Sequence, residues 1–214
     1  MRLYVSIGPN PRIVRMYAAE RGVALEEIWI DLAAGENRRE PFLSLNPAGQ
    51  LPVLEIGPGQ IIAESLTICE YLDEALDTPS PHLIGCDPFR RARTRMWLRR
   101  IEERYSQPVT AAFRYGPGLA MFGLRLRCLP EAAEGMAALA RDGEAWLDAQ
   151  MPAGGFVASD MLTLADIALY CFMDFANNRA GLPPDPKHSV LSSWFGRMDA
   201  RDSAQLTKAH AKRA

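Results

Sequence analysis

The segment Ala63-Glu64-Ser65 combines residue types that could hold both charges of a zwitterion. It lies between a predicted strand and a predicted helix. The helix N-terminus and the Ser65 hydroxyl favour a carboxylate, and the Glu64 carboxylate favours an ammonium group. Together they describe a site for the free end of an amino acid. A plain helix N-cap at Ser65 explains the same residues without any ligand.

The segment Gln50-Leu51-Pro52 could present main-chain groups to a ligand. A proline that begins a strand is common and needs no further function. A cis Leu51–Pro52 bond would turn the Leu51 main chain outward, so that its N–H and C=O could pair with an extended peptide. Because only about 5–6% of X–Pro bonds are cis, the residues alone favour the trans form.

The segment SIGPNPR, residues 6–12, has the composition of a ligand-holding turn between a strand and a helix. Its centre, Gly8 to Pro11, contains no hydroxyl or thiol. The turn could therefore hold a ligand atom, but it supplies no nucleophile of its own.

The segment LTLAD, residues 162–166, predicts the start of a helix. Thr163 and Asp166 have the spacing of a capping box, and Leu162 and Ile167 stand at hydrophobic staple positions. We interpret this segment as structural, so that its loss should harm folding rather than chemistry.

The first eighty residues alternate between strand and helix patterns. The helix that follows the turn has Pro11 as its first residue and Gly22 at its end. A GPG turn separates the last two strands and predicts a hairpin. The predicted elements are a strand at 2–7, a helix at 10–22, a strand at 25–32, a short helix or turn at 37–49, hairpin strands at 51–56 and 60–64, and a helix at 65–76. This order is the thioredoxin topology.

A proline-rich linker at 77–88 then separates this region from purely helical patterns. We expect a charged helix at 89–107 that Pro108 kinks or ends, a second helix at 130–151, and a nearly all-apolar central helix at 163–176. The sequence therefore predicts two domains, at 1–78 and 88–214.

Composition excludes several classes of protein. A net charge of -2 and a pI near 6.0 give no basic footprint for nucleic acid, and the basic stretch at 208–213 is interpreted as a solvated helix end. No apolar run approaches the ~18 residues of a membrane span, and the N-terminus lacks a signal peptide pattern. Cys69 and Cys171 fall inside apolar helical patterns and are expected to be buried, which fits a reducing cytoplasm. The three histidines are isolated, so no metal site is expected.

Three segments in this order and spacing resemble the cytosolic glutathione transferase family: LNPAGQLPVL (45–54), AESLTICEYL (63–72) and MLTLADIALY (161–170). The resemblance spans essentially the whole chain. It implies an α/β thioredoxin-like domain that binds glutathione, followed by an all-α helical domain that shapes a pocket for an electrophile. It also implies a homodimer, with glutathione as a substrate and no separate cofactor.

The resemblance assigns roles to several residues. It favours a cis Pro52, with the Leu51 main chain holding the cysteinyl part of glutathione. Glu64 and Ser65 would bind the γ-glutamyl end. Gln50, and less directly Arg38 or Arg39, would contact the glycyl carboxylate.

The chemistry of this family is stabilisation of the glutathione thiolate. A free thiol has a pKa near ~8.5, which hydrogen bonds and a helix N-terminus lower. Many classes use a Tyr, Ser or Cys at the end of the first strand, and this chain departs from them. Its turn resembles that of nu-class members, in which an asparagine corresponds to Asn10, although they usually carry a threonine at the position of Gly8.

Pro9 and Asn10 are thus expected at the sulfur, with main-chain N–H groups and the Asn10 amide as donors and with weaker stabilisation than a hydroxyl would give. Asn10 can serve as a helix N-cap at the same time. Ser6 is the second candidate donor, and Tyr4 ranks last. In the helical domain Tyr105 and Tyr115, and with them Glu103 and Arg114, belong to helices that line the pocket in the family, but a place on the helix surface or in inter-helix packing explains them better.

The leading hypothesis is a glutathione transferase that acts on small electrophiles. A glutathione-dependent peroxidase or disulfide reductase is the alternative, and the missing cysteine argues against a glutaredoxin-like mixed disulfide on the protein. A binding or scaffold protein that has lost activity is a second alternative, which the missing hydroxyl or thiol supports. Retention of the Glu64-Ser65 and Gln50-Leu51-Pro52 segments favours the enzyme.

Overall fold

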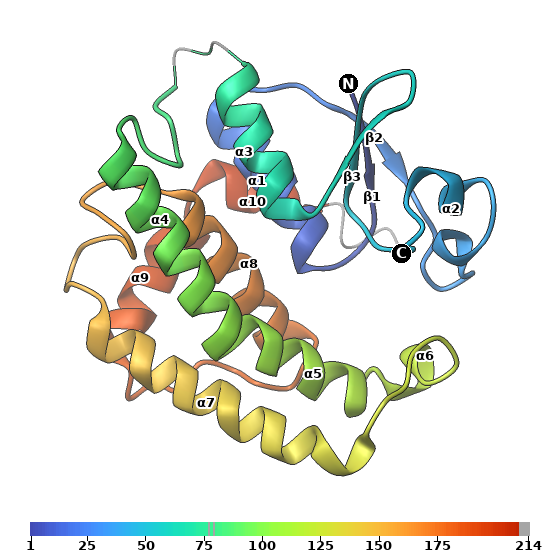
Figure 1. The fold of residues 1–214 in the computed structure, drawn as a ribbon. Coiled ribbons are helices and arrows are strands. Elements are labelled where there is room, and N and C mark those ends of the chain that lie inside the picture. The colour runs from blue at the N-terminus through green and yellow to red at the C-terminus, as the bar shows by residue number, and fades with distance from the viewer. Residues whose placement is uncertain (77, 79, 210–214) are drawn as a thin grey trace. The chain divides into compact units, whose positions relative to one another are not determined.

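The computed structural model describes residues 1–76, 78 and 80–209, which are divided between two compact units (Figure 1). Unit 1 consists of Met1–Ile84 together with the segment from Arg201 onward, and unit 2 is Gly85–Ala200. Residues 201–209 thus lie with the N-terminal residues, whereas the sequence analysis grouped them with the helical domain. The predicted linker at 77–88 and basic helix end at 208–213 lie partly outside the described residues.

The described part of unit 1 contains a mixed four-stranded sheet in the order β2-β1-β3-β4. Its strands are β1 (Arg2–Val5), β2 (Glu26–Trp29), β3 (Val53–Gly57) and β4 (Gln60–Ala63). β1 is parallel to β2, and β3 is antiparallel to both β1 and β4. The predicted hairpin and the thioredoxin-like topology are confirmed.

The described part of unit 1 also contains five helical elements. They are α1 (Pro9–Arg21), the 3-10 turn η1 (Glu36–Arg38), α2 (Phe42–Leu45), α3 (Ser65–Ala75) and α10 (Asp202–Ala209). Side chains alternate along the strands, so Val53 and Tyr4 pack with Phe42 of α2 on one face. Leu3 and Leu54 point to the other face and are fully buried.

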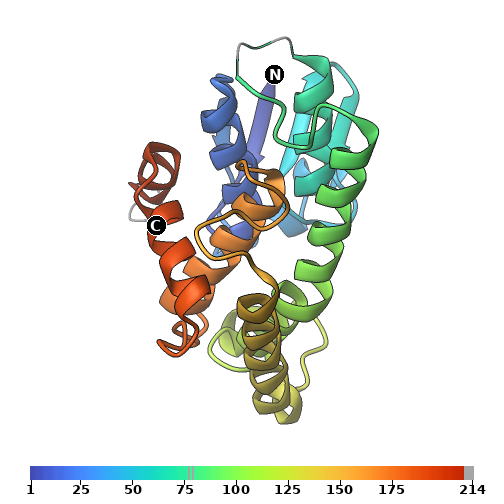
Figure 2. The same ribbon diagram turned by 90° about the vertical axis from the view of Figure 1, so that its left-hand side faces the viewer.

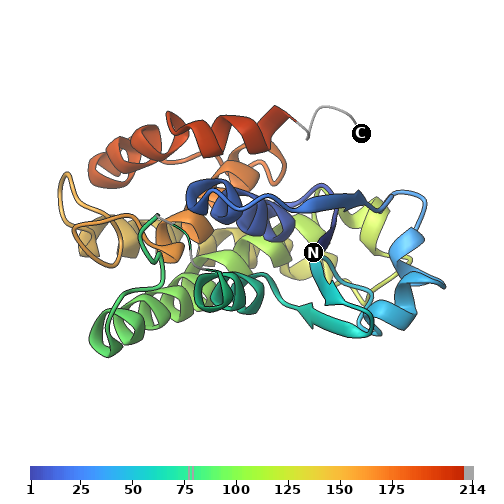
Figure 3. The ribbon, with the colours of Figure 1, turned by 90° about the horizontal axis from the view of Figure 1, so that it is seen from above.

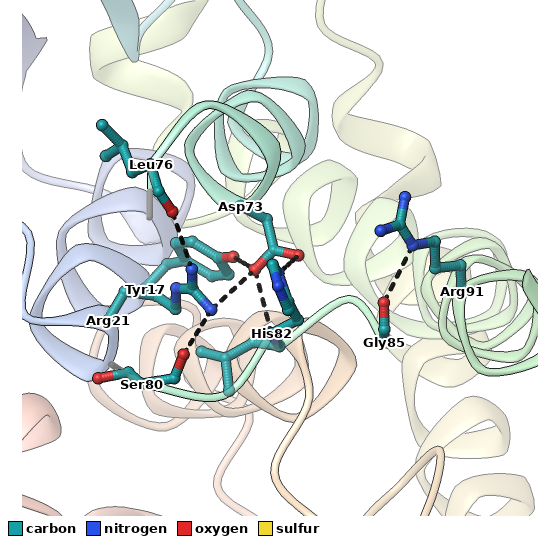
Figure 4. A network of polar contacts seen from close by, with 9 residues as sticks. Tyr17, Arg21, Asp73, Leu76, Ser80, His82, Gly85 and Arg91 are labelled. Atoms are coloured by element: carbon teal, nitrogen blue, oxygen red, sulfur yellow. Dashed lines mark hydrogen bonds and ion pairs between the residues drawn. The ribbon is translucent and has the colours of Figure 1, made fainter. Parts of the chain in front are cut away.

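Helices α1 and α3 pack together around one buried carboxylate, that of Asp73 (Figure 4). Asp73 accepts a short hydrogen bond from the Tyr17 hydroxyl, and it lies 3.4 Å from the Arg21 guanidinium. Nδ1 of His82 lies 3.1 Å from its Oδ2, and the Leu83 N–H donates to its Oδ1 at 3.2 Å. Asp73 therefore joins α1, α3 and the segment that follows α3.

All regular secondary structure in the described residues of unit 2 is helical. Its elements are α4 (Pro88–Ile101), η2 (Glu102–Ser106), α5 (Gln107–Tyr115), α6 (Leu119–Phe122), η3 (Pro130–Ala132), α7 (Ala133–Gln150), α8 (Leu164–Asn178) and α9 (Ser189–Asp199). α8 is buried along most of its length, as its apolar pattern predicts, and it packs against α4 and α9. The predicted combination of an α/β thioredoxin-like part and an all-helical part is confirmed.

Of the two effects expected of Pro108, a kink or an end of the helix of residues 89–107, the end is not observed. α4, η2 and α5 follow one another without a break, and Pro108 lies in the first turn of α5 (Figures 1 and 2). The intervening η2 is π-helical, and such a wider turn relieves the clash of a proline ring with the preceding turn. α7 crosses this segment closely, since a Cβ on Gly143 would lie 1.9 Å from the Arg104 carbonyl oxygen.

The capping box of α8 is confirmed. The Asp166 carboxylate accepts from the Thr163 N–H at 2.9 Å and from the Thr163 hydroxyl at 2.8 Å. It also accepts from the Val157 N–H at 2.8 Å and from the Trp194 indole N–H at 3.0 Å. Asp166 thereby ties the start of α8 to the preceding loop and to α9.

Cys69 and Cys171 are buried, as expected, whereas Cys86 is exposed and Cys128 is half-buried. Within residues 1–76, 78 and 80–209, no cluster of three or more His, Cys, Asp or Glu could hold a metal ion. Over the same residues, no helix is both long enough and apolar enough to cross a membrane.

Candidate functional site

Three loops of unit 1 line a small pocket that is partly open to solvent. They are the β1–α1 turn, the α2–β3 loop and the β4–α3 junction. The residues that line it are Asn10, Asn46, Gln50, Leu51, Pro52, Glu64 and Ser65. Six of the eight site residues predicted from the sequence therefore meet in one place, although they are separated by up to 55 positions along the chain.

The N-terminus of α3 faces this pocket. Ser65 is the first helical residue and Glu64 is the N-cap, so the expectation of Ser65 as N-cap is wrong. Glu64 adopts φ 69°, a conformation that residues other than glycine rarely take. Among the described residues no side chain caps α3, and the first N–H groups of a helix have no partner within it. These N–H groups and the helix dipole favour an anion.

The N-terminus of α1 forms another wall. The helix begins at Pro9 after Gly8, whose φ is 142°, so Asn10 is a first-turn residue and its predicted role as N-cap is wrong. Pro9 and Pro11 have no N–H, which removes two of the four donors that a helix N-terminus normally offers. Gly8 and Asn10 supply the remaining main-chain donors. Donation at this turn is therefore concentrated on Asn10, which has both a main-chain N–H and a side-chain amide.

A hydrogen bond joins the two helix starts. The Ser65 hydroxyl donates to Oδ1 of Asn10 at 3.4 Å. This contact occupies the acceptor side of the Asn10 amide and leaves its NH₂ group to donate elsewhere. Ser65 thus orients the side chain that the sequence analysis proposed as the thiolate donor.

The third wall is the loop before β3. The Asn46 amide donates to the Gln50 carbonyl at 2.9 Å and accepts from the Ala48 N–H at 3.2 Å. Leu51–Pro52 is cis, as the family resemblance implies. Among the described residues, the Leu51 N–H and C=O have no hydrogen-bond partner, so both can pair with a ligand.

Asn46 is a pocket residue that the sequence analysis missed. It lies inside the motif at 45–54, and an asparagine just before a Pro-x-Gly turn suits side-chain bonding to the loop main chain. A neighbouring residue, Asn37, donates to the Gly49 carbonyl at 2.6 Å, and Gly49 has φ 61°. Two asparagine side chains thus hold the main chain of this loop through hydrogen bonds.

The remaining predicted residues do not line this pocket. Ser6 is buried, and its hydroxyl contacts the Ile7 carbonyl at 3.4 Å. Pro9 begins α1 without lining the pocket. The Tyr4 hydroxyl donates to Glu55 at 2.9 Å, and burial together with this carboxylate raises the pKa of Tyr4. Arg38 donates to the Ala48 carbonyl at 3.3 Å and so supports the loop.

The candidates in unit 2 are mostly engaged within that unit. Tyr105 is buried, and burial raises the pKa of its hydroxyl well above the usual value of 10.0. Glu103 pairs with Arg99 at 2.6 Å, and the Arg114 guanidinium lies over the ring of Phe122. Packing and surface pairing therefore account for these three side chains.

Comparison with known proteins agrees with this geometry. Residues 7–75 match the family model of the glutathione S-transferase N-terminal domain, and residues 130–197 match that of the C-terminal domain. Glutathione S-transferase 2 of Saccharomyces cerevisiae is 31% identical over 210 residues, which cover 92% of this chain and 84% of the relative. A maleylacetoacetate isomerase of Pseudomonas aeruginosa is 38% identical over 84 residues, which cover 38% and 39% of the two chains.

The solved structure of Gtt2 from Saccharomyces cerevisiae superposes with a TM-score of 0.87 at 27% identity, over 97% of this chain and all of that one. The sequence match over 92% of the chain, the two family models and the shared fold all point to one assignment. The chain belongs to the glutathione S-transferase family.

Proposed function

We propose that the chain is a glutathione transferase: it binds glutathione in the pocket of unit 1, stabilises its thiolate and transfers it to small electrophiles. One observation carries this proposal. Asn10, Gln50, Leu51, Glu64 and Ser65, which resemble the family's glutathione contacts, all line the same pocket. A scaffold that did not bind glutathione would have no use for this convergence. A homodimer and a cytoplasmic location remain predictions.

Each wall of the pocket suits one part of the tripeptide. The uncapped start of α3 would bind the γ-glutamyl carboxylate, and the Ser65 hydroxyl would turn from its long contact with Asn10 to donate to the same carboxylate. Glu64 would bind the ammonium group. The Leu51 N–H and C=O would pair with the cysteinyl main chain, as an added strand does. Gln50 would hold the glycyl carboxylate. The cysteinyl sulfur would then lie at the α1 turn.

At that turn, the Asn10 amide and N–H would donate to the sulfur. A hydrogen bond to a charged group contributes about 1.5–3 kcal/mol, and each pKa unit corresponds to about 1.4 kcal/mol. The Asn10 side chain alone can therefore lower the thiol pKa by about 1 to 2. The thiolate attacks the electrophile directly, so no covalent intermediate on the protein is needed.

Two other reactions would use the same site. Glutathione-dependent reduction of peroxides or disulfides needs the same thiolate, and Gly8, Pro9 and Asn10 offer no cysteine for a protein-bound mixed disulfide. The similarity to a maleylacetoacetate isomerase supports isomerisation assisted by bound glutathione as a further candidate. Assays with an aromatic halide, a hydroperoxide, a glutathione mixed disulfide and a cis-dienone acid compare these reactions on one preparation.

The decisive test is an ultraviolet titration of the thiolate of bound glutathione against pH. We expect the wild type to ionise the thiol well below ~8.5, and Asn10→Ala to raise the thiol pKa by about 1 to 2. Asn10→Asp keeps the shape and the contact to Ser65 but removes the donor, so it should raise the pKa at least as far. Ser6→Ala, which removes the second candidate donor, should change nothing.

If the wild type does not bind glutathione, or binds it with an unshifted thiol, the transferase proposal fails and the scaffold alternative takes its place. If Ser6→Ala rather than Asn10→Ala moves the pKa, the transferase stands but its donor is Ser6.

A further inference from the structure

We propose that Arg12 is a positioning residue for the thiol-binding turn, and that the C-terminal helix α10 holds it in place. The inference rests on the proposed glutathione function and extends it to a helix nearly 200 residues away in the sequence. Arg12 follows Asn10 and Pro11 directly, and its guanidinium is turned away from solvent, with the residue 9% exposed.

Arg12 makes two hydrogen bonds to α10. Its Nε donates to Oγ1 of Thr207 at 3.2 Å, and its Nη2 donates to the Ala204 carbonyl at 3.3 Å. Thr207 is itself buried. The planar guanidinium makes both bonds in a fixed geometry, which an ammonium group could not reproduce.

Further contacts fix the position and direction of α10 along α1. Nη1 of Arg15 donates to the Thr207 carbonyl at 3.2 Å, and its Nε pairs with Glu27 of β2 at 2.6 Å. At the other end of α1, Glu20 accepts from Arg201 at 2.7 and 2.8 Å and makes a short hydrogen bond with Ser203. The two helices are therefore antiparallel neighbours, so that the end of α10 lies at the start of α1 (Figure 3).

The α1 turn has few hydrogen bonds of its own, although Pro11, Ile13 and Val14 are buried behind it. In the described part of the chain, no side chain caps α1, and two of the first three residues are prolines without an N–H. The Asn10–Ser65 hydrogen bond is long, at 3.4 Å. A buried guanidinium fixed to α10 therefore sets where the first turn of α1 lies. Near-attack geometry is sensitive to displacements of about 1 Å. Weaker contacts between Arg12 and α10 should therefore displace the Asn10 donors relative to the glutathione sulfur.

The test uses Thr207, which lies outside the pocket and lets the Arg12 charge stay in place. Thr207→Val removes the acceptor for Nε of Arg12 at nearly constant volume, and Thr207→Ser restores it. Arg201→Met is the matched control, because it releases α10 at the end of α1 that is remote from Asn10. For each variant we would measure the melting temperature, the calorimetric Kd for glutathione and the pH titration of the bound thiol.

We expect Thr207→Val to raise the thiol pKa by about 0.5, the effect of weakening one hydrogen bond to the sulfur, and to raise the glutathione Kd by about threefold, which is the same free energy. Thr207→Ser should return both values to those of the wild type. Arg201→Met should lower the melting temperature while leaving Kd and thiol pKa unchanged.

The inference is overturned if Thr207→Val keeps the Kd and thiol pKa of the wild type, whatever its melting temperature. It is also overturned if Arg201→Met moves the thiol pKa as far as Thr207→Val does, since α10 would then act through stability alone. If Thr207→Val fails to fold, Arg12→Lys decides by the same two readouts. A wild type that does not ionise bound glutathione refutes the proposed function instead, so the two failures are distinguishable.

Discussion

Replacement of Asp166 by alanine should destabilise unit 2 and leave the glutathione pocket intact. The Asp166 side chain is fully buried, and its two oxygens accept four hydrogen bonds from described residues: two from Thr163 and one each from Val157 and Trp194. Three of these donors are N–H groups, which cannot turn to a new partner as a hydroxyl can.

The size of the effect follows from this count. Each buried donor left without a partner costs about 1–3 kcal/mol, and neighbouring losses are not fully additive. We therefore expect the free energy of unfolding to fall by about 3–5 kcal/mol. For a chain of this length about 1 kcal/mol corresponds to about 2–4 °C, so the melting temperature should fall by about 6–20 °C.

The assay is thermal unfolding followed by circular dichroism, with glutathione affinity measured by calorimetry well below the transition. Asp166→Asn keeps the shape but points an NH₂ group at two donors, so it should lose a comparable amount. Asp160→Ala, at an exposed position, should stay within about 0.5 kcal/mol of the wild type. An unchanged melting temperature for Asp166→Ala would show that the four hydrogen bonds of Asp166 do not stabilise unit 2 as argued. A stable Asp166→Ala protein without glutathione affinity would refute the division of roles between the two units.

Two further predictions concern unit 1. Ser65→Ala should weaken glutathione binding by about 1–2 kcal/mol, or about five- to thirtyfold in Kd, and an unchanged calorimetric affinity would mean that the γ-glutamyl site lies elsewhere. Burial raises the pKa of the Glu20 carboxyl, but hydrogen bonds from Arg201 and Ser203 outweigh it, and the pKa lies below the usual 4.5. A lowered folded-state pKa stabilises the protein above the unfolded-state pKa, and this stabilisation is lost as the pH falls through the folded-state value. The melting temperature of the wild type should thus exceed that of Glu20→Gln near neutral pH and approach it below pH 4.5; a constant difference would contradict this.

The sequence predicted the pocket better than it predicted the geometry of each residue in it. Motifs identify which segments meet, because strand–turn–helix order brings loop ends to one edge of a sheet. They do not show where a helix begins within a turn. Ser65 and Asn10 were each expected as N-caps, yet Glu64 and Gly8 hold those positions. Main-chain angles such as φ 69° at Glu64 shift the first helical residue by one position. The residue type does not predict such an angle.

The contribution of α10 could not be predicted from the sequence at all. Arginines on a helix are normally solvated, so the pattern of α1 gave no reason to bury Arg12 and Arg15. Only the return of the chain from residue 201 to unit 1 supplies the carbonyls and the Thr207 hydroxyl that these guanidinium groups need. Contacts across 192 to 195 positions leave no periodic trace in either helix.

The carboxylate of Asp73 also limits how this protein can change over evolutionary time. Arg21 is buried beside it, so loss of either partner leaves the other as an unpaired charge or unmet donors in the interior, at a cost of about 3–5 kcal/mol. Replacing both by apolar residues of similar volume can be nearly neutral. An ionic and an apolar version of this junction are therefore both viable, but each single substitution between them passes through a poorly folded chain. Positions 21 and 73 should change together or not at all. Position 17 should change with them, because the Tyr17 hydroxyl donates to Asp73.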